Sequence, residues 1–162
     1  MTRWRLFGLI VMVGLVVDQF TKILVDRSMT LYQSIPVLDG LFNLTYLRNK
    51  GAAFSFLSTA SWRIPFFIGV TLVAAVVILV TVRKLREEQR LAQSALAMIF
   101  SGAVGNLIDR VRLGEVIDFL DVYWKGYHWP AFNVADSLIC VGVTLMALEM
   151  FREERKQISS RS

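Results

Sequence analysis

Acidic side chains within or beside long apolar segments are the residues of this 162-residue chain that could do chemistry. Asp118 follows the apolar pair Val116-Ile117, and Asp136 lies three residues after Asn133 in another apolar stretch. No neighbour in the sequence would neutralise either carboxylate. Ionisable residues inside apolar segments are functional candidates by default. Asp118 and Asp136 are therefore the first candidates for a catalytic role.

Two further sets of polar residues have helical spacing. Asn106, Asp109 and Arg110 occupy positions i, i+3 and i+4, so they lie on one face of a helix. Asp18 and Lys22 occupy positions i and i+4, which suits a structural ion pair, and we favour that interpretation for them. An ion pair would also explain Asp109 with Arg110. Both sets are candidates to support the two carboxylates.

The single histidine and the single cysteine narrow the chemistry further. His128 lies among aromatic residues, where an anchoring role is favoured over a Ser-His-Asp triad. Cys140 lies in the middle of an apolar segment and is expected to be a small buried residue. A Ser–Lys pair with Lys22 or Lys50 is disfavoured, because a lysine that faces carboxylates or water stays protonated and is a poor base.

Two kinds of chemistry remain open for the acidic residues Asp109, Asp118, Asp121 and Asp136. Together they could bind a hard divalent cation, since such cations prefer oxygen ligands. Alternatively, two carboxylates could share one proton and activate water, as in aspartic proteases. The residues alone do not decide between a metal site and an aspartate pair.

Long apolar segments must position these residues. Hydrophobic residues make up 55% of the chain and charged residues 19%, and the mean hydropathy is +0.53. An ordinary soluble domain carries more charge and scatters its apolar residues, and a disordered chain is excluded by the low charge. Four blocks approach the length of about 20 helical residues that crosses a bilayer. We predict one integral-membrane domain over 1–162, with transmembrane helices at about 6–25, 64–82, 91–109 and 131–150.

Basic residues indicate the orientation of these helices. Ten Lys and Arg residues flank one end of the predicted helices, against seven in the two longer connections at about 26–63 and 110–130. Cytoplasmic segments carry the excess of positive charge, so both termini are placed in the cytoplasm and the long connections outside. The first segment has no cleavage site and is expected to be retained. This topology explains the net charge of +5, and no nucleic-acid partner is expected.

The outer connections are expected to be structured. Apolar and polar residues alternate over 42–46, and residues 116–124 are rich in β-branched and aromatic side chains. Both patterns are typical of β-strands. The predicted fold is therefore a membrane all-α core of four helices with a small extracytoplasmic β-sheet on the outer membrane surface. The candidate polar residues then lie near the outer ends of the helices.

Five motifs occur in order across the four predicted helices. They are Asp18-Gln19-Phe20-Thr21-Lys22, Arg48-Asn49-Lys50-Gly51-Ala52-Ala53-Phe54, Gly102-Ala103-Val104-Gly105-Asn106-Leu107-Ile108-Asp109-Arg110, Val116-Ile117-Asp118-Phe119 and Phe132-Asn133-Val134-Ala135-Asp136. With these motifs the chain resembles the lipoprotein signal peptidase family, the signal peptidase II of bacteria. Five motifs in register are highly specific, and they cover nearly the whole chain.

The resemblance implies an aspartic membrane endopeptidase that removes the signal peptide from diacylglyceryl-modified prolipoproteins, cutting just before the lipidated Cys. It implies that Asp118 and Asp136 are the catalytic pair. The residues implied to hold substrate or to position the pair are Asn49, Asn106, Asp109, Arg110 and Asn133. Those implied to form structural motifs are Asp18, Lys22, Gly51 and Gly105.

The same resemblance implies a place in the bacterial inner membrane, in contact with lipid, and inhibition by globomycin-type antibiotics. We expect no cofactor, no metal and a monomeric protein. The alternative is a non-enzymatic tetraspan transporter whose carboxylates relay protons. A transporter would keep polar groups along its path to the cytoplasm. Residues 73–80 and 141–147, in the inner halves of two helices, are nearly pure hydrocarbon, which favours the enzyme.

Overall fold

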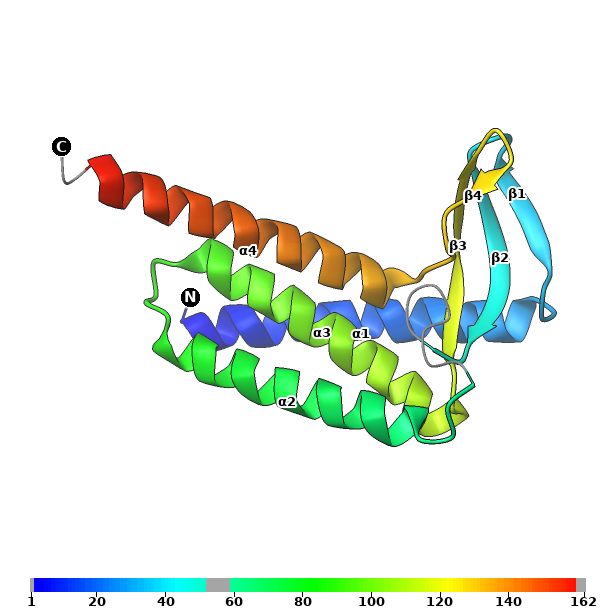
Figure 1. Ribbon diagram of the computed structural model, residues 1–162, viewed down its shortest axis with the longest axis horizontal. Helices are drawn as coiled ribbons and strands as arrows, with labels where there is room; N and C mark the ends of the chain where they lie inside the picture. Colours follow the sequence, from blue (N-terminus) through cyan, green and yellow to red (C-terminus); the bar gives the residue numbers. More distant parts are fainter. Residues whose placement is uncertain (1, 52–58, 160–162) are drawn as a thin grey trace.

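The computed structural model describes residues 2–51 and 59–159, and it contains the four predicted helices and a small antiparallel sheet (Figure 1). The helices are α1 (Arg3–Ser28), α2 (Arg63–Lys84), α3 (Arg90–Leu113) and α4 (Val134–Ser159). The strands are β1 (Ser34–Leu38), β2 (Phe42–Asn49), β3 (Val116–Trp124) and β4 (Tyr127–His128). All four helices are long and apolar enough to cross a membrane.

The helix boundaries differ from the predicted ones, and the difference at the start of α4 affects the candidate site. The first three helices extend by one to four residues beyond each predicted end, because their terminal turns include polar residues that a hydropathy count leaves out. The fourth helix starts at Val134 and not near residue 131, so Asn133 precedes the helix instead of lying within it.

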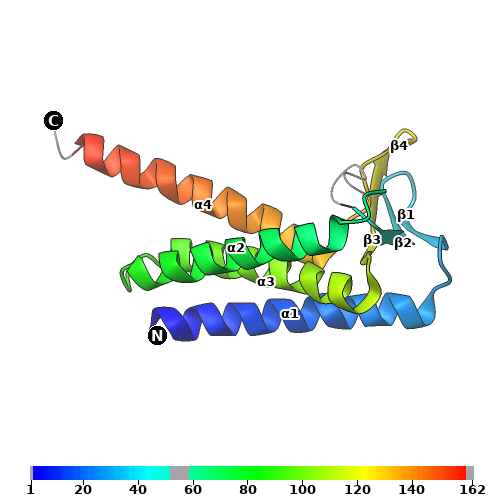
Figure 2. The same ribbon diagram turned by 60° about the horizontal axis from the view of Figure 1, so that its bottom comes forward.

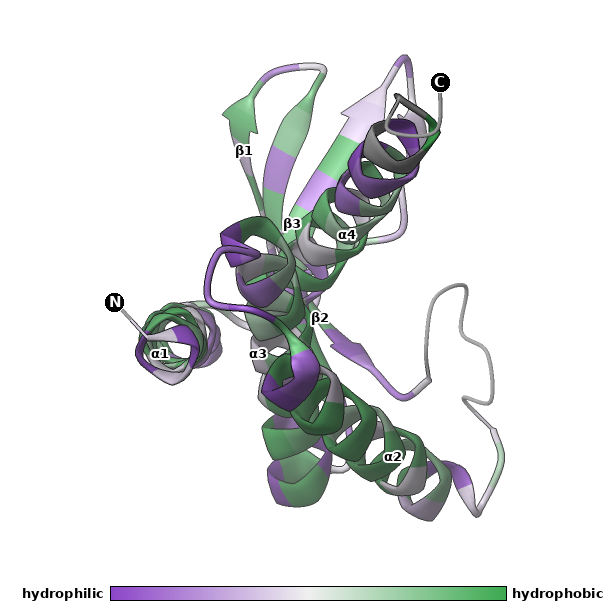
Figure 3. Ribbon diagram, turned by 90° about the vertical axis from the view of Figure 1, so that its left-hand side faces the viewer, coloured by the Kyte–Doolittle hydropathy of each residue, from purple (hydrophilic) through white to green (hydrophobic). Residues whose placement is uncertain are grey.

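Helix α3 lies at the centre of the bundle and packs against each of the other three helices (Figures 1, 2 and 3). Its sequence is the least apolar of the four spans, because polar residues such as Gln93 and Ser101 dilute it. Both side chains are buried by neighbouring helices, so they face protein instead of lipid. The central place of α3 therefore explains its reduced hydropathy.

Two glycines of α3 allow the helices to approach closely. A Cβ atom at Gly102 would collide with the backbone oxygen of Ala135 in α4. A Cβ atom at Gly105 would lie 2.5 Å from Oδ2 of Asp18 in α1. A larger residue at Gly102 would push α4 away, and a larger residue at Gly105 would displace the buried side chain of Asp18. The two glycines thus bring α1 and α4 against the same part of α3.

The outer helices present apolar surface away from α3. In α2 only Ile78 and Val82 are buried, while its other large apolar side chains are exposed or partly exposed. Figure 3 shows this hydrophobic colouring along α2 and on parts of α1 and α4. Such a surface is costly in water and suits the hydrocarbon of a bilayer.

The sheet lies at one end of the bundle, and both chain termini lie at the other (Figures 1 and 2). Its strand order is β1-β2-β3-β4, and neighbouring strands are antiparallel. The predicted strands correspond to β2 and β3, whereas β1 and β4 were not predicted. In the register of β2 and β3, Asn49 pairs with Val116 and Leu47 with Asp118. This pairing brings the end of β2 beside the buried start of β3.

Candidate active site

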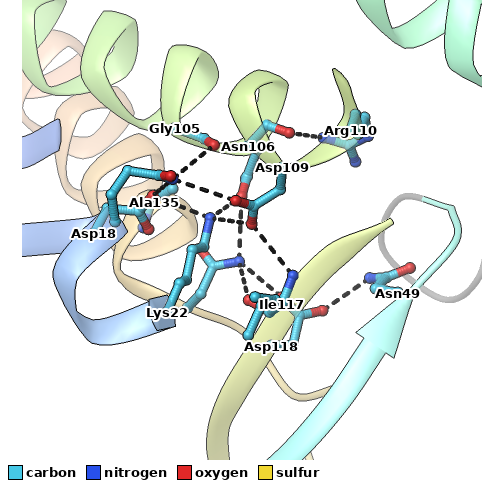
Figure 4. Close-up of polar contacts among 12 residues, drawn as sticks. Asp18, Lys22, Asn49, Gly105, Asn106, Asp109, Arg110, Ile117, Asp118 and Ala135 are labelled. Carbon is cyan, nitrogen blue, oxygen red and sulfur yellow. Dashed lines mark hydrogen bonds and ion pairs between the residues drawn. The ribbon is translucent and has the colours of Figure 1, made fainter. Parts of the chain in front are cut away.

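The two candidate catalytic carboxylates lie where the start of β3, the outer half of α3 and the start of α4 meet. Asp118 is the third residue of β3 and its side chain is 3% exposed. Asp136 lies in the first turn of α4. Figure 4 shows the polar contacts of Asp118 with the surrounding elements. The fold thus brings together two acids that are 18 residues apart in the sequence.

Two amide side chains connect the carboxylates. Asn133 Nδ2 donates to Asp118 Oδ1 at 2.7 Å, and Asn106 Nδ2 donates to Asp136 Oδ1 at 2.8 Å. The amides also meet each other, since Asn133 Nδ2 lies 3.2 Å from Asn106 Oδ1. The result is a continuous hydrogen-bonded chain from Asp118 through Asn133 and Asn106 to Asp136, which fixes the relative placement of the two acids.

Asn49 contacts Asp118 from the opposite side. Its Nδ2 atom donates to Asp118 Oδ2 at 3.0 Å, so both oxygens of this carboxylate accept a hydrogen bond from an amide. The Oδ1 atom of Asn49 accepts the backbone N–H of Gly51 at 2.9 Å. Asn49 therefore joins the end of β2 to Asp118. The Ala52-Ala53-Phe54 part of its motif lies outside the described residues.

Asn133 and Asp136 cap the start of α4. The N–H of Asp136 donates to Asn133 Oδ1 at 2.9 Å, and the N–H of Asn133 donates to Asp136 Oδ2 at 3.3 Å. This is the reciprocal pattern of a capping box, in which two side chains satisfy the free N–H groups of a helix start. The prediction placed Asn133 within the helix as well as Asp136, whereas Asn133 lies one residue before it. The Asn-x-x-Asp spacing is typical of a helix cap, and it could have been used to predict that the helix starts after Asn133.

Lys22 is buried at the centre of a second cluster beside the carboxylates (Figure 4). Its Nζ atom lies 3.0 Å from Asp18 Oδ2 and 2.9 Å from Asp109 Oδ2. It also donates to Asn106 Oδ1 at 3.0 Å. The Asp18–Lys22 ion pair follows the predicted spacing. The Lys22–Asp109 pair joins α1 to α3. It could not be predicted from the spacing of residues within one helix, because the two residues are far apart in the sequence.

Arg110 connects α3 to the segment that follows β2. Its Nη2 atom donates to the carbonyl oxygen of Gly51 at 3.0 Å, and its guanidinium carbon lies 4.5 Å from the centre of the Phe67 ring in α2. A cation above an aromatic face is attracted by the ring quadrupole. Arg110 points away from Asp109, so the two are not the ion pair that their adjacency suggested.

Burial and charge together change the acidity of Asp118. Loss of hydration, together with the negative charge of Asp136, raises the pKa of this carboxyl from 3.8 to about 7. Hydrogen bonds from Asn49 and Asn133 and the positive charge of Lys22 act in the opposite direction but do not cancel the rise. A carboxyl with a pKa near neutrality can hold a proton and release it at physiological pH.

Several other candidates lie in separate surroundings. Asp121 accepts hydrogen bonds from Asn43 at 3.1 Å and pairs with His128 Nδ1 at 2.8 Å. His128 stacks on the ring of Tyr123, in keeping with an anchoring role. Lys50 lies 3.7 Å from Glu115. Cys140 is exposed, contrary to the prediction, because it lies on a face of α4 that other helices do not cover.

The described residues contain no group of three His, Cys, Asp or Glu side chains with metal-ligand geometry. Along β3, Asp118 and Asp121 are three residues apart, and alternation in a strand turns them toward opposite faces. The four acids weighed as cation ligands are therefore divided between different clusters. The structure defines a multi-helix membrane protein with two amide-linked carboxylates at one end of its bundle.

Comparison with known proteins agrees with this description. The sequence model for signal peptidase (SPase) II matches residues 10–152, and the chain belongs to this family of membrane proteases. The lipoprotein signal peptidase of Geobacter sulfurreducens is 70% identical over 154 residues, which is 95% of this chain and 96% of the relative. The lipoprotein signal peptidase of Haemophilus influenzae strain PittGG is 45% identical over 150 residues, which is 92% of this chain and 87% of the relative.

Solved structures agree with the fold as well. A structure described as a bacterial membrane enzyme, obtained by the in meso method at 2.3 Å resolution, superposes with a TM-score of 0.83 and 33% identity. The match covers 91% of this chain and 88% of the other. A second such structure, at 1.9 Å resolution, has a TM-score of 0.81 and 35% identity, covering 89% and 91%.

Proposed function

We propose that this signal peptidase II cleaves the signal peptide from diacylglyceryl-modified prolipoproteins just before the lipidated Cys, with Asp118 and Asp136 activating the attacking water. The observation that carries this proposal is the chain of hydrogen bonds that holds the two carboxylates together through Asn133 and Asn106. Two amides held in this way leave the carboxylates as a fixed pair beside which a peptide bond can be placed.

The pair divides the work of an acid and a base. Asp118, with a pKa of about 7, carries the proton that polarises the peptide carbonyl. Asp136 takes a proton from water, which then attacks the carbonyl carbon. The tetrahedral intermediate collapses with loss of the C–N bond, and the leaving amine receives a proton from the pair. Asn49, next to Asp118, and Arg110, next to the carbonyl of Gly51, are placed to align the peptide backbone.

Cleavage of a defined substrate tests this assignment. The purified protein, in detergent, is incubated with a prolipoprotein that carries a diacylglyceryl-modified Cys, and the products are analysed by mass spectrometry. We expect a single cut before the modified Cys and no cut in the same prolipoprotein without the lipid. Cleavage elsewhere, or equal cleavage of the unmodified form, would contradict the substrate class. Globomycin-type inhibitors should compete with the lipidated substrate.

The membrane orientation is a second part of the proposal. The basic termini and the α2–α3 turn lie at the end of the bundle opposite the sheet, which supports cytoplasmic termini and an outward-facing site in the bacterial inner membrane (Figure 1). A monomer in contact with lipid fits this arrangement, since each outer helix turns its apolar side chains away from α3.

Labelling of engineered cysteines measures this orientation. The experiment uses a Cys140→Ser background, which removes the native thiol. In spheroplasts, whose inner membrane is intact, Lys125→Cys in the β3–β4 turn should react with a membrane-impermeant maleimide. Arg86→Cys, in the α2–α3 turn, is the matched control and should react only after the inner membrane is permeabilised. The reverse pattern would place the site on the cytoplasmic side.

Inhibitor sensitivity distinguishes the proposed pair from other chemistries. We expect that EDTA, serine-acylating reagents and thiol-blocking reagents leave activity unchanged. The reasons are that amide groups already occupy both oxygens of Asp118, and that Cys140 lies on an outward face of α4. The measurement is the initial cleavage rate before and after treatment. Activity that is lost in EDTA and restored by a divalent cation would support the cation site instead.

A further inference from the structure

The buried Lys22 cluster contacts the backbone directly before each of the two candidate catalytic residues. Asp18 Oδ1 accepts the N–H of Ala135, the residue before Asp136, at 2.9 Å. Asp109 Oδ2 accepts the N–H of Ile117, the residue before Asp118, at 3.3 Å. One carboxylate therefore holds the start of α4, and the other holds the start of β3.

Lys22 unites these two contacts. A lysine ammonium has three N–H donors, and the three acceptors within reach of Lys22 are Asp18, Asp109 and the side-chain oxygen of Asn106. Its side chain is 1% exposed, so water does not compete for these donors. The third bond has a separate consequence. Because the oxygen of the Asn106 amide faces Lys22, its nitrogen is turned to Asp136.

We propose that Lys22 is the positioning residue of the catalytic pair: it joins the carboxylates that hold β3 and α4, and it orients the Asn106 amide toward Asp136. This proposal rests on the proposed function, since it assumes that Asp118 and Asp136 react. Lys22 itself has no contact with the reacting atoms. Its removal should therefore slow the chemical step and leave substrate binding intact.

A neutral replacement of the whole cluster tests the proposal without leaving unpaired buried charges. In Asp18→Asn/Lys22→Met/Asp109→Asn, the amide oxygens can still accept the N–H groups of Ala135 and Ile117, but Asn106 Oδ1 loses the Lys22 donor and keeps only the longer contact to Asn133. We expect kcat to fall about a hundredfold, because small misplacements of reacting groups have effects of that size. KM for a lipidated peptide should stay within a factor of about three, well below the loss in kcat.

Gln93→Met is the matched control for loss of a buried polar side chain from the same bundle. Gln93 lies at the other end of α3 and donates to the backbone oxygen of Arg86 at 2.7 Å. This variant should lower the Tm and leave kcat unchanged when it is measured well below the Tm. If the cluster variant behaves in the same way, with a lower Tm and parental kcat, Lys22 is only structural and the proposal is overturned.

The single variant Lys22→Met adds a readout that a purely structural residue would not move. Asp118 is faced by Asp136 from α4, by Lys22 from α1 and by Arg110 from α3. Removing the Lys22 charge should shift the alkaline limb of the kcat profile to higher pH, and an unchanged limb contradicts the proposal. If Asp118→Asn and Asp136→Asn both retain turnover, the proposed function is refuted. If both are inactive while the Lys22 variants keep the parental kcat, the proposed function stands and only the role of Lys22 is refuted.

Discussion

Replacement of Asp118 or Asp136 by Asn is expected to lower kcat by about 10³-fold, the range typical for loss of an essential acid or base. Asn has nearly the shape of Asp and can still accept the amide hydrogen bonds at Oδ1, so each variant should fold and insert in the membrane. It cannot carry or accept the transferred proton. The measurement is kcat for a lipidated peptide with purified protein of verified Tm.

Asp121→Asn is the matched control for this experiment. Asp121 is also a buried acid of β3, three residues after Asp118, but its partners are His128, Asn43 and Thr45. We expect this variant to keep near-parental kcat. Turnover close to the parental value in Asp118→Asn or Asp136→Asn would remove that residue from the catalytic pair, and a metal-bound water would become the stronger explanation.

The second large effect is a loss of activity at alkaline pH. The pKa of Asp118 is raised from 3.8 to about 7 by burial and by the charge of Asp136. Two close carboxylates titrate as a pair, so the apparent values belong to both groups. Catalysis needs one proton on the pair. As the pH rises through about 7, that proton leaves, and kcat/KM should then fall about tenfold for each further pH unit.

The acid side of the profile follows from the same pair. When the pH falls low enough to protonate both carboxylates, no base remains to activate water, so the profile should be bell-shaped. The test measures kcat/KM for a soluble lipopeptide in detergent, over the pH range in which the protein stays folded. Asp121→Asn should give the same curve as the parent. A kcat/KM that keeps rising above pH 8 would falsify the shared-proton mechanism.

Hydropathy and local spacing predicted those features that depend on neighbouring residues. The four apolar blocks predicted the four helices, because each block has about the length that a helix needs to cross a bilayer. The alternation over 42–46 gave β2. The apolar surroundings of Asp118 and Asp136 gave the candidate pair, since an ionisable residue is retained at such a place only for a reason.

Features that depend on distant contacts could not be predicted in this way. Lys22 was interpreted as a partner of Asp18 alone, because only α1 is visible in local spacing, and its bond to Asp109 exists only after α3 packs against α1. The capping role of Asn133 was hidden by a helix boundary placed three residues early. Strand β1, whose residues are all exposed, lacks the alternation that identifies a half-buried strand.

The packing of three helices around α3 also has a consequence for how this peptidase and its substrate meet. The other three helices pack around α3 and turn apolar surface outward, so the bilayer surrounds the bundle on several sides. A lipidated substrate in the same bilayer arrives by lateral diffusion. The encounter is then a two-dimensional search, and its rate depends on the number of substrate molecules per unit of membrane area. Adding lipid at constant bulk concentration dilutes the substrate, whereas adding water does not.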